Sequence, residues 1–328
     1  MSTETNTAFE EELKKLNHIK SEVAKVVVGQ SELIERLLIA MLSNGHVLIE
    51  GVPGLAKTLT ISTLAQALNV DFSRIQFTPD LLPGDVIGTQ VYNQKTHEFS
   101  AHKGPIFANM VLADEINRSP AKVQSALLEA MQEKQVTIGG ETYKLDQPFL
   151  VMATQNPVEQ EGTYPLPEAQ LDRFLFKLCV TYPDFDEEHE VMKRMASNKE
   201  LEAVNHVLNP EEIIKMREVV DQVFSSEEIE RYIIRLVDAT RFPAKYGLDH
   251  LNRYISHGVS PRASISLLKA SKVYAMMQGR EFVLPDDVKV MAKDVMRHRI
   301  SISYKAEADE KSTDDIINEL LSAITYNG

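Results

Sequence analysis

The segment HVLIEGVPGLAKT, residues 46–58, constrains the fold more than any other part of the chain. A short apolar run, Val47–Ile49, has the pattern of a buried strand, and glycines and a proline interrupt it. Lys57 and Thr58 follow at once, and apolar residues then recur at helical spacing. A strand, a glycine-rich loop, a Lys-Thr pair and a helix are together the parts of a phosphate-binding loop.

The chemistry of this loop is that of a nucleotide site. Small residues let backbone N–H groups approach a phosphate closely, and the start of a helix adds positive potential. We expect Lys57 to reach the β- and γ-phosphates of ATP, and the Thr58 hydroxyl to ligate Mg²⁺. The expected nucleotide-binding positions are Gly51, Val52, Pro53, Gly54, Leu55, Ala56, Lys57 and Thr58. The alternative is an ordinary strand–turn–helix corner whose lysine is solvated.

One residue departs from the usual pattern G-x-x-x-x-G-K-[ST], because Ala56 holds the position of the last glycine. Only a positive φ angle requires glycine. We therefore expect Ala56 to have a negative φ angle.

Composition narrows the classes of function. A chain of 328 residues suffices for two domains, or for one large and one small, with a substantial core. The net charge of −13 disfavours a primary nucleic-acid role, since phosphate backbones need basic protein faces.

The sequence also favours a cytoplasmic protein. The only cysteine, Cys179, lies in an apolar run and is expected to be buried, and no disulfide can form within the chain. The polar N-terminus lacks the apolar core of a signal peptide, and no apolar run approaches the roughly 18 residues that span a bilayer. We therefore expect no membrane span.

Apolar segments that alternate with helical patterns predict an α/β core with a parallel five-stranded sheet and right-handed crossovers. The predicted strands lie at 47–49, 71–77, 110–113, 149–154 and 174–180. Alternating runs within 81–103 and 135–145 predict two β-hairpin insertions, the second around Gly139-Gly140. The predicted domains are a nucleotide-binding core with N-terminal helices at 1–183, a linker at 184–209 and an all-α lid at 210–328.

Polar residues that follow two of these strands are the candidates for hydrolysis. Asp114 and Glu115 end one strand, and strand ends face the ligand crevice of a parallel sheet. Asp114 would hold the Mg²⁺ hydration shell, and Glu115 would orient and deprotonate water. Asn156, after another strand, could bridge that water and the γ-phosphate. The alternatives are a helix-capping acidic pair and an Asn-Pro turn.

Two arginines complete the candidate set. Arg173 precedes the last strand and could reach the nucleotide of a neighbouring subunit; the alternative is an ion pair with Asp172. Arg262 opens a helix, where a cation is unfavourable unless an anion lies nearby, so a γ-phosphate contact is one interpretation and an exposed arginine the other.

The segments GVPGLAKT, VLADEINRSP, ATQNP, LPEAQLDRF and GVSPRAS, in this order, resemble the MoxR family of AAA+ ATPases from about residue 28 to about residue 299. The alanine at position 56 is characteristic of that family. The resemblance implies an AAA+ P-loop core and the following roles: Walker A Lys57 and Thr58, Walker B Asp114 and Glu115, sensor 1 Asn156, arginine finger Arg173, and sensor 2 Arg262.

The resemblance also implies a ring, usually a hexamer, that acts as a chaperone on partner complexes. Its partners often include a von Willebrand factor A domain protein, and its work is the maturation or insertion of metal cofactors. Two other functions remain open at this point. One is a motor that nucleic acid stimulates through the Gly139-Gly140 hairpin, and the other is a scaffold that hydrolyses nucleotide slowly and signals by assembly.

Overall fold

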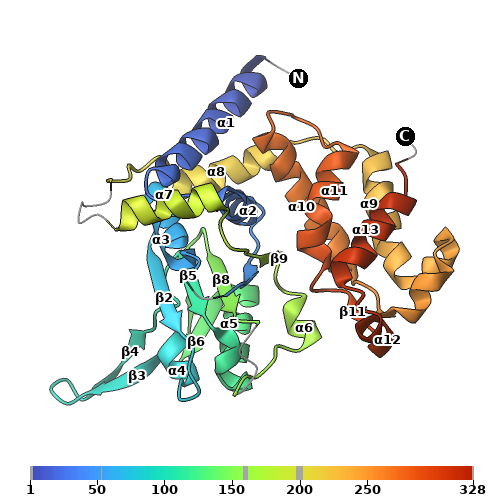
Figure 1. Ribbon diagram of the computed structural model, residues 1–328. Coiled ribbons are helices and arrows are strands. Elements are labelled where there is room, and N and C mark those ends of the chain that lie inside the picture. The colour runs from blue at the N-terminus through green and yellow to red at the C-terminus, as the bar shows by residue number, and fades with distance from the viewer. Residues whose placement is uncertain (1–2, 53, 158–161, 197–201, 327–328) are drawn as a thin grey trace. The chain divides into compact units, whose positions relative to one another are not determined.

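The computed structural model describes residues 3–52, 54–157, 162–196 and 202–326 (Figure 1). The chain divides into two compact units. The first, which we call the sheet unit, comprises Lys14–Leu166 and Leu178–Lys215. The second, the helical unit, comprises Met1–Leu13, Pro167–Lys177 and Met216–Gly328.

A five-stranded sheet forms the centre of the fold, in the order β2-β5-β8-β1-β9. The strands are β1 (Val47–Glu50), β2 (Phe72–Gln76), β5 (Met110–Asp114), β8 (Leu150–Gln155) and β9 (Phe176–Cys179). The pairs β2–β5, β5–β8 and β8–β1 are parallel, as the sequence predicts. The apolar residues of β1, β5 and β8 are buried, which is typical of parallel strands covered on both faces.

Helices alternate with these strands as expected for an α/β fold, and others precede β1 or follow β9. They are α1 (Thr3–Ala24), α2 (Ser31–Leu42), α3 (Lys57–Ala67), α4 (Pro83–Ile87), the 3-10 turn η1 (Ile116–Arg118), α5 (Ala121–Glu133), α7 (Phe185–Met195) and α8 (Pro210–Asp221). No helix in the described ranges is both long and apolar enough to cross a bilayer.

Both predicted hairpin insertions are confirmed. The strands β3 (Gly88–Asn93) and β4 (Glu98–Lys103) pair antiparallel and project away from the sheet (Figure 1). The strands β6 (Gln135–Ile138) and β7 (Glu141–Lys144) form the second hairpin. Its turn residues, Gly139 and Gly140, have φ angles of 60° and 92°, a conformation that only glycine adopts without strain.

The helical unit is mainly helical beyond residue 220, as predicted for the lid. Its helices are α6 (Glu168–Leu171), α9 (Glu227–Arg241), α10 (Pro261–Met277), α11 (Pro285–Met296), α12 (Tyr304–Ala308) and α13 (Thr313–Ala323), with 3-10 turns η2 (Pro243–Tyr246) and η3 (Asp249–Arg253). It also contains a short antiparallel pair that was not predicted, between β10 (Ile255–His257) and β11 (Ser301–Ile302).

The expectation that Cys179 is buried is wrong, because its side chain is exposed. Strand β9 lies at the edge of the sheet and alternates: Phe176 and Leu178 are buried, while Lys177 and Cys179 are more accessible. An apolar run on an edge strand can therefore expose one of its faces, which the sequence pattern alone did not reveal.

A buried histidine joins three parts of the sheet unit. His46, which precedes β1, donates from Nε2 to the carbonyl oxygen of Met131 at 3.1 Å. Its Nδ1 accepts a hydrogen bond from the backbone N–H of Val151 on β8 at 3.0 Å. Both ring nitrogens are thus used by the neutral imidazole.

We expect His46→Leu to lower the free energy of unfolding by about 1–3 kcal/mol, because a buried carbonyl and a buried N–H lose their partner. Urea unfolding followed by circular dichroism would measure this. His102→Leu on the exposed face of β4 is the matched control and should change stability little. Equal unfolding midpoints for the two variants would contradict the structural role of His46.

Candidate functional site

A cavity of about 490 Å³ lies at the carboxyl ends of β1, β5 and β8. Its lining residues all belong to the sheet unit. They are Gly51, Gly54, Leu55, Ala56, Lys57, Thr58, Leu59, Arg74, Gln76, Asp114, Glu115, Thr154, Gln155 and Asn156. The volume falls in the range of small-molecule and cofactor sites.

Most of the residues predicted from the sequence meet in this cavity. Val52 is not among its lining residues, and Pro53 lies outside the residues that the structure describes. Arg173 and Arg262 belong to the helical unit and are not among the lining residues.

The expected negative φ angle of Ala56 is wrong. Its φ angle is 52°, in the left-handed region, and the φ angle of Gly54 is 88°. Ala56 is the N-cap of α3, and its carbonyl oxygen accepts hydrogen bonds from the backbone N–H and the hydroxyl of Thr60, at 2.9 and 3.0 Å. The left-handed conformation costs an alanine about 1–2 kcal/mol. It occurs at the N-cap, where the loop changes direction into α3.

Lys57 bends back over the loop. Its Nζ donates a hydrogen bond to the carbonyl oxygen of Gly51 at 2.7 Å. Partial burial lowers the pKa of Lys57, and the nearby charges of Asp114 and Glu115 act in the opposite direction. The ammonium group lies at the cavity wall, near both carboxylates. An anionic ligand bound there would compensate for the hydration that the ammonium group has lost.

A buried hydroxyl joins the two strands that carry the acidic residues and Asn156. Thr154 on β8 donates from Oγ1 to Asp114 Oδ1 at 2.6 Å, and it accepts a hydrogen bond from the backbone N–H of Glu115 at 2.8 Å. Glu115 has a φ angle of 57°, a strained value for this residue type. Thr154 thus fixes the direction in which Asp114 and Glu115 leave the end of β5.

Three side chains engage the outer oxygens of these carboxylates. Arg74 on β2 pairs with Asp114 Oδ2 through Nη2 at 2.6 Å. Gln76, also on β2, donates to Glu115 Oε2 at 3.0 Å. Arg118 pairs with the same Glu115 oxygen at 3.1 Å. The two acidic groups are thus balanced by cationic and amide donors.

The residues predicted from the sequence do not include Arg74, Gln76 and Thr154. A signal for the first two was present, because residues two apart on a strand share a face. The register then pairs Gln76 with Asp114 across the sheet. Without knowledge that β2 and β5 are neighbours, that signal could not be assigned to the site.

The residues at the cavity fit a magnesium ion that accompanies a nucleotide. The Asp114 carboxylate and the Thr58 hydroxyl line the same cavity and supply hard oxygen ligands. In the described part of the chain, no group of three or more His, Cys, Asp and Glu side chains could hold a metal ion. Magnesium bound with phosphates commonly takes only one or two protein ligands.

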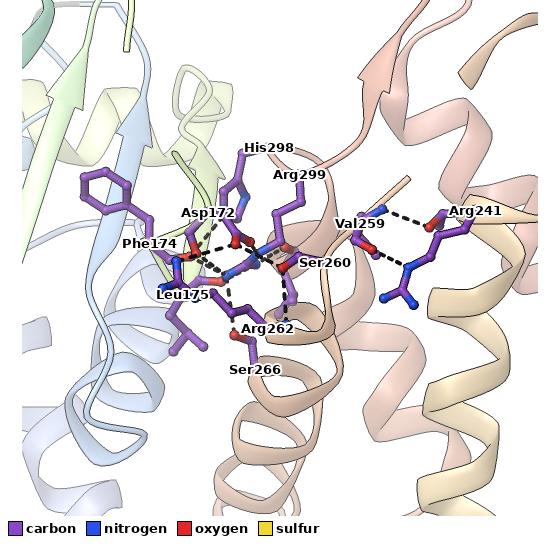
Figure 2. A network of polar contacts seen from close by, with 12 residues as sticks. Asp172, Phe174, Leu175, Arg241, Val259, Ser260, Arg262, Ser266, His298 and Arg299 are labelled. Atoms are coloured by element: carbon purple, nitrogen blue, oxygen red, sulfur yellow. Dashed lines mark hydrogen bonds and ion pairs between the residues drawn. The ribbon is translucent and has the colours of Figure 1, made fainter. Parts of the chain in front are cut away.

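The two predicted arginines, Arg173 and Arg262, are both neighbours of Asp172, one in sequence and one in space. Arg262 pairs with Asp172 Oδ2 through Nη1 at 3.6 Å (Figure 2). The N-cap hydroxyl of Ser260 donates to the same oxygen at 3.0 Å. The anion expected beside Arg262 is thus present in the form of a carboxylate. Arg173 is the residue that directly follows Asp172.

Comparison with known proteins agrees with this arrangement. Residues 46–176 match the model of the ATPase family associated with various cellular activities (AAA), and residues 250–320 match the AAA lid domain. Chaperone MoxR1 of Mycobacterium tuberculosis is 48% identical over 92% of this chain and 80% of its own length. The Bacillus subtilis protein YeaC is 45% identical over 97% of both chains.

A solved structure is similar as well. The crystal structure of a putative ATPase from Cytophaga hutchinsonii is 52% identical and superposes with a TM-score of 0.93. The match covers 99% of this chain and 98% of the other.

The left-handed Ala56 leads to a prediction. We expect Ala56→Gly to raise the free energy of unfolding by about 1 kcal/mol, because glycine adopts this φ angle without a steric cost. The control is Ala65→Gly in the interior of α3, which should lose about 1 kcal/mol or more. Urea unfolding measures both, and an equal loss of stability would show that residue 56 is not left-handed in solution.

Proposed function

Because this chain belongs to the MoxR family of AAA+ ATPases, which includes chaperones, we propose that it hydrolyses ATP to ADP and phosphate and uses the energy to remodel partner proteins. The observation that carries the proposal is the cavity itself. It joins Lys57 and Thr58 of a phosphate-binding loop to the carboxylates of Asp114 and Glu115 and to the amide of Asn156.

In the proposed reaction, the loop amides and Lys57 bind the phosphates of ATP. Glu115 accepts a proton from a water molecule whose oxygen attacks the γ-phosphorus, while the bond to the bridging oxygen breaks and ADP leaves. Asn156 orients that water. Magnesium, when bound at Thr58 and Asp114, neutralises charge on the phosphates.

We assign Arg173 the role of an arginine finger for the nucleotide of a neighbouring subunit, and Arg262 that of a γ-phosphate contact. A guanidinium in the finger role contributes about 10³- to 10⁵-fold in rate. A finger that acts on a neighbour requires an oligomer, and the active assembly is proposed to be a ring, a hexamer. The proposed partner is a cytoplasmic protein complex that contains a von Willebrand factor A domain. The ring is proposed to mature this complex or to insert its metal cofactor.

One observation favours a slower variant of this function. Asp114 and Glu115 are both engaged by side chains of the chain itself, namely Arg74, Gln76 and Arg118. These bonds must be exchanged before the carboxylates act on substrate, which favours a low basal rate. A turnover that no partner raises would support a nucleotide-regulated scaffold.

The second hairpin offers little support for a nucleic-acid motor. Lys134 and Lys144 are accompanied by Glu133 and Glu141, so its surface is not distinctly basic. Nζ of Lys134 donates to the side chain of Asn44 at 2.8 Å.

Two substitutions separate binding from hydrolysis. Lys57→Ala should abolish ATP affinity in calorimetry, because the phosphates lose their cation.

Glu115→Gln should keep the affinity for ATP and lower kcat by about 10²- to 10⁴-fold in phosphate-release assays, because the base is lost. Glu129→Gln on the exposed face of α5 is the matched control. Undiminished turnover of Glu115→Gln would overturn its assignment as the base.

A mixture of variants tests the finger. Arg173→Ala should bind ATP and lose about 10³-fold or more in kcat. Mixed with Glu115→Gln subunits, which carry an intact finger, it should regain part of the wild-type rate. Arg231→Ala on the exposed part of α9 is the control and should hydrolyse normally. A mixture with no more activity than its components would refute action in trans.

A further inference from the structure

The segment that carries Arg173 is part of the helical unit. Residues 167–177 follow β8 in sequence and include the first two residues of β9, yet they group with α9–α13. Arg173 and Arg262, the two arginines assigned to phosphate chemistry, thus belong to one compact unit. The ion pair between Arg262 and Asp172, the residue before Arg173, lies wholly within it (Figure 2).

Three consecutive residues after α11 bind the backbone of this segment. Arg297 Nη1 donates to the carbonyl oxygen of Lys177 at 2.9 Å. His298 Nε2 donates to the carbonyl oxygen of Phe174 at 3.0 Å. Burial lowers the pKa of His298 well below its usual value, so the ring is neutral and these bonds do not depend on its charge.

Arg299 makes the most extensive contacts of the three. Its Nε donates to Asp172 Oδ1 at 2.8 Å, and its Nη2 donates to the carbonyl oxygen of Phe174 at 2.6 Å. Its Nη1 donates to the carbonyl oxygen of Leu175 at 3.2 Å. Only 2% of the side chain is exposed, and burial lowers its pKa to about 10, so Arg299 remains charged at neutral pH.

The backbone on both sides of Arg173 is therefore held by one buried guanidinium. Asp172 precedes Arg173 and Phe174 follows it, and Arg299 Nη2 donates to the carbonyl oxygens of both, at 3.4 and 2.6 Å. A planar donor group with several fixed N–H directions can hold such an arrangement, whereas a single ammonium cannot.

The same carboxylate reaches the start of α10. Asp172 Oδ2 accepts from the hydroxyl of Ser260 and pairs with Arg262, opposite the oxygen that Arg299 binds (Figure 2). Val259, which precedes Ser260, makes two hydrogen bonds to α9. Its carbonyl oxygen accepts from Arg241 Nε at 2.7 Å, and its N–H donates to Thr240 Oγ1 at 3.0 Å. The start of α10 is therefore anchored on two sides.

We propose that Asp172 and Arg299 are positioning residues that hold Arg173 in a fixed relation to α10 and Arg262. The pair thereby fixes the direction in which one subunit offers its finger to the next. This inference depends on the proposed roles of Arg173 and Arg262.

Asp172→Asn tests the inference because it removes the ion pair and leaves the finger in the sequence. A misplacement of about 1 Å can cost about 100-fold in rate, so we expect kcat to fall by roughly 10- to 100-fold. The affinity for ATP should stay within about threefold of wild type, because no loop residue changes.

Asp287→Asn is the matched control. Asp287 also forms a buried ion pair in the helical unit, with Arg280, and only 3% of its side chain is exposed. It caps α11 rather than binding the segment of Arg173. The Asp287→Asn variant should lose stability without a loss in kcat. An equal loss of kcat in both variants would mean that Asp172 acts only through stability, and it would overturn the inference.

Mixed rings give the decisive readout. Lys57→Ala subunits cannot bind nucleotide but carry an intact finger, so mixing them with Asp172→Asn subunits should restore turnover above that of either variant alone. A mixture of Lys57→Ala with Arg173→Ala is measured in parallel. Recovery in both mixtures supports the inference, and recovery only with Arg173→Ala overturns it. Recovery in neither refutes the finger in trans and, with it, this inference.

Arg299→Lys serves as a second variant if Asp172→Asn does not fold. Lysine keeps the buried charge but cannot donate to Asp172, Phe174 and Leu175 in the same geometry. It should show the same loss of kcat and the same recovery in mixed rings. Wild-type kcat in a folded Arg299→Lys protein would overturn the inference.

Discussion

The parallel pairing of β1, β5 and β8 is the constraint on which the site depends. Parallel strands end at the same edge of a sheet, so the loop after β1, the carboxylates after β5 and the amide after β8 all arrive at one cavity. Consecutive residues of these strands are buried, because both faces of the sheet are covered at its centre. The hydroxyl of Thr154 then joins two of the strand ends directly.

The charges at the cavity balance one another. Two adjacent carboxylates repel, and Lys57 and Arg74 supply the opposite charge beside them. Arg74 comes from β2, the edge strand next to β5, so the outermost strand of the sheet contributes to the site. The site thus contains an internal set of partners for its acidic residues, and substrate and metal compete with this set.

The helical unit uses a buried charge in a different way. Arg299 and Asp172 are 127 residues apart in the chain, and their contact holds the backbone around Arg173. A buried ion pair contributes little net stability compared with apolar packing, but the loss of one partner is costly. Such a pair suits a position where geometry matters more than stability, which is the reason for assigning it a positioning role.

Local sequence patterns predict the strand–loop–helix at residues 46–67, the two hairpins, the helical lid beyond residue 210 and the candidate residues at strand ends. These features depend on local periodicity and on turn chemistry, which neighbouring residues set. Tertiary packing, by contrast, sets the left-handed φ angle of Ala56, the exposure of Cys179 on an edge strand, and the contacts of Arg74, Thr154 and Arg299. The physical reason is that strand order and the packing of distant segments set these features, and no local pattern encodes which strand lies beside which.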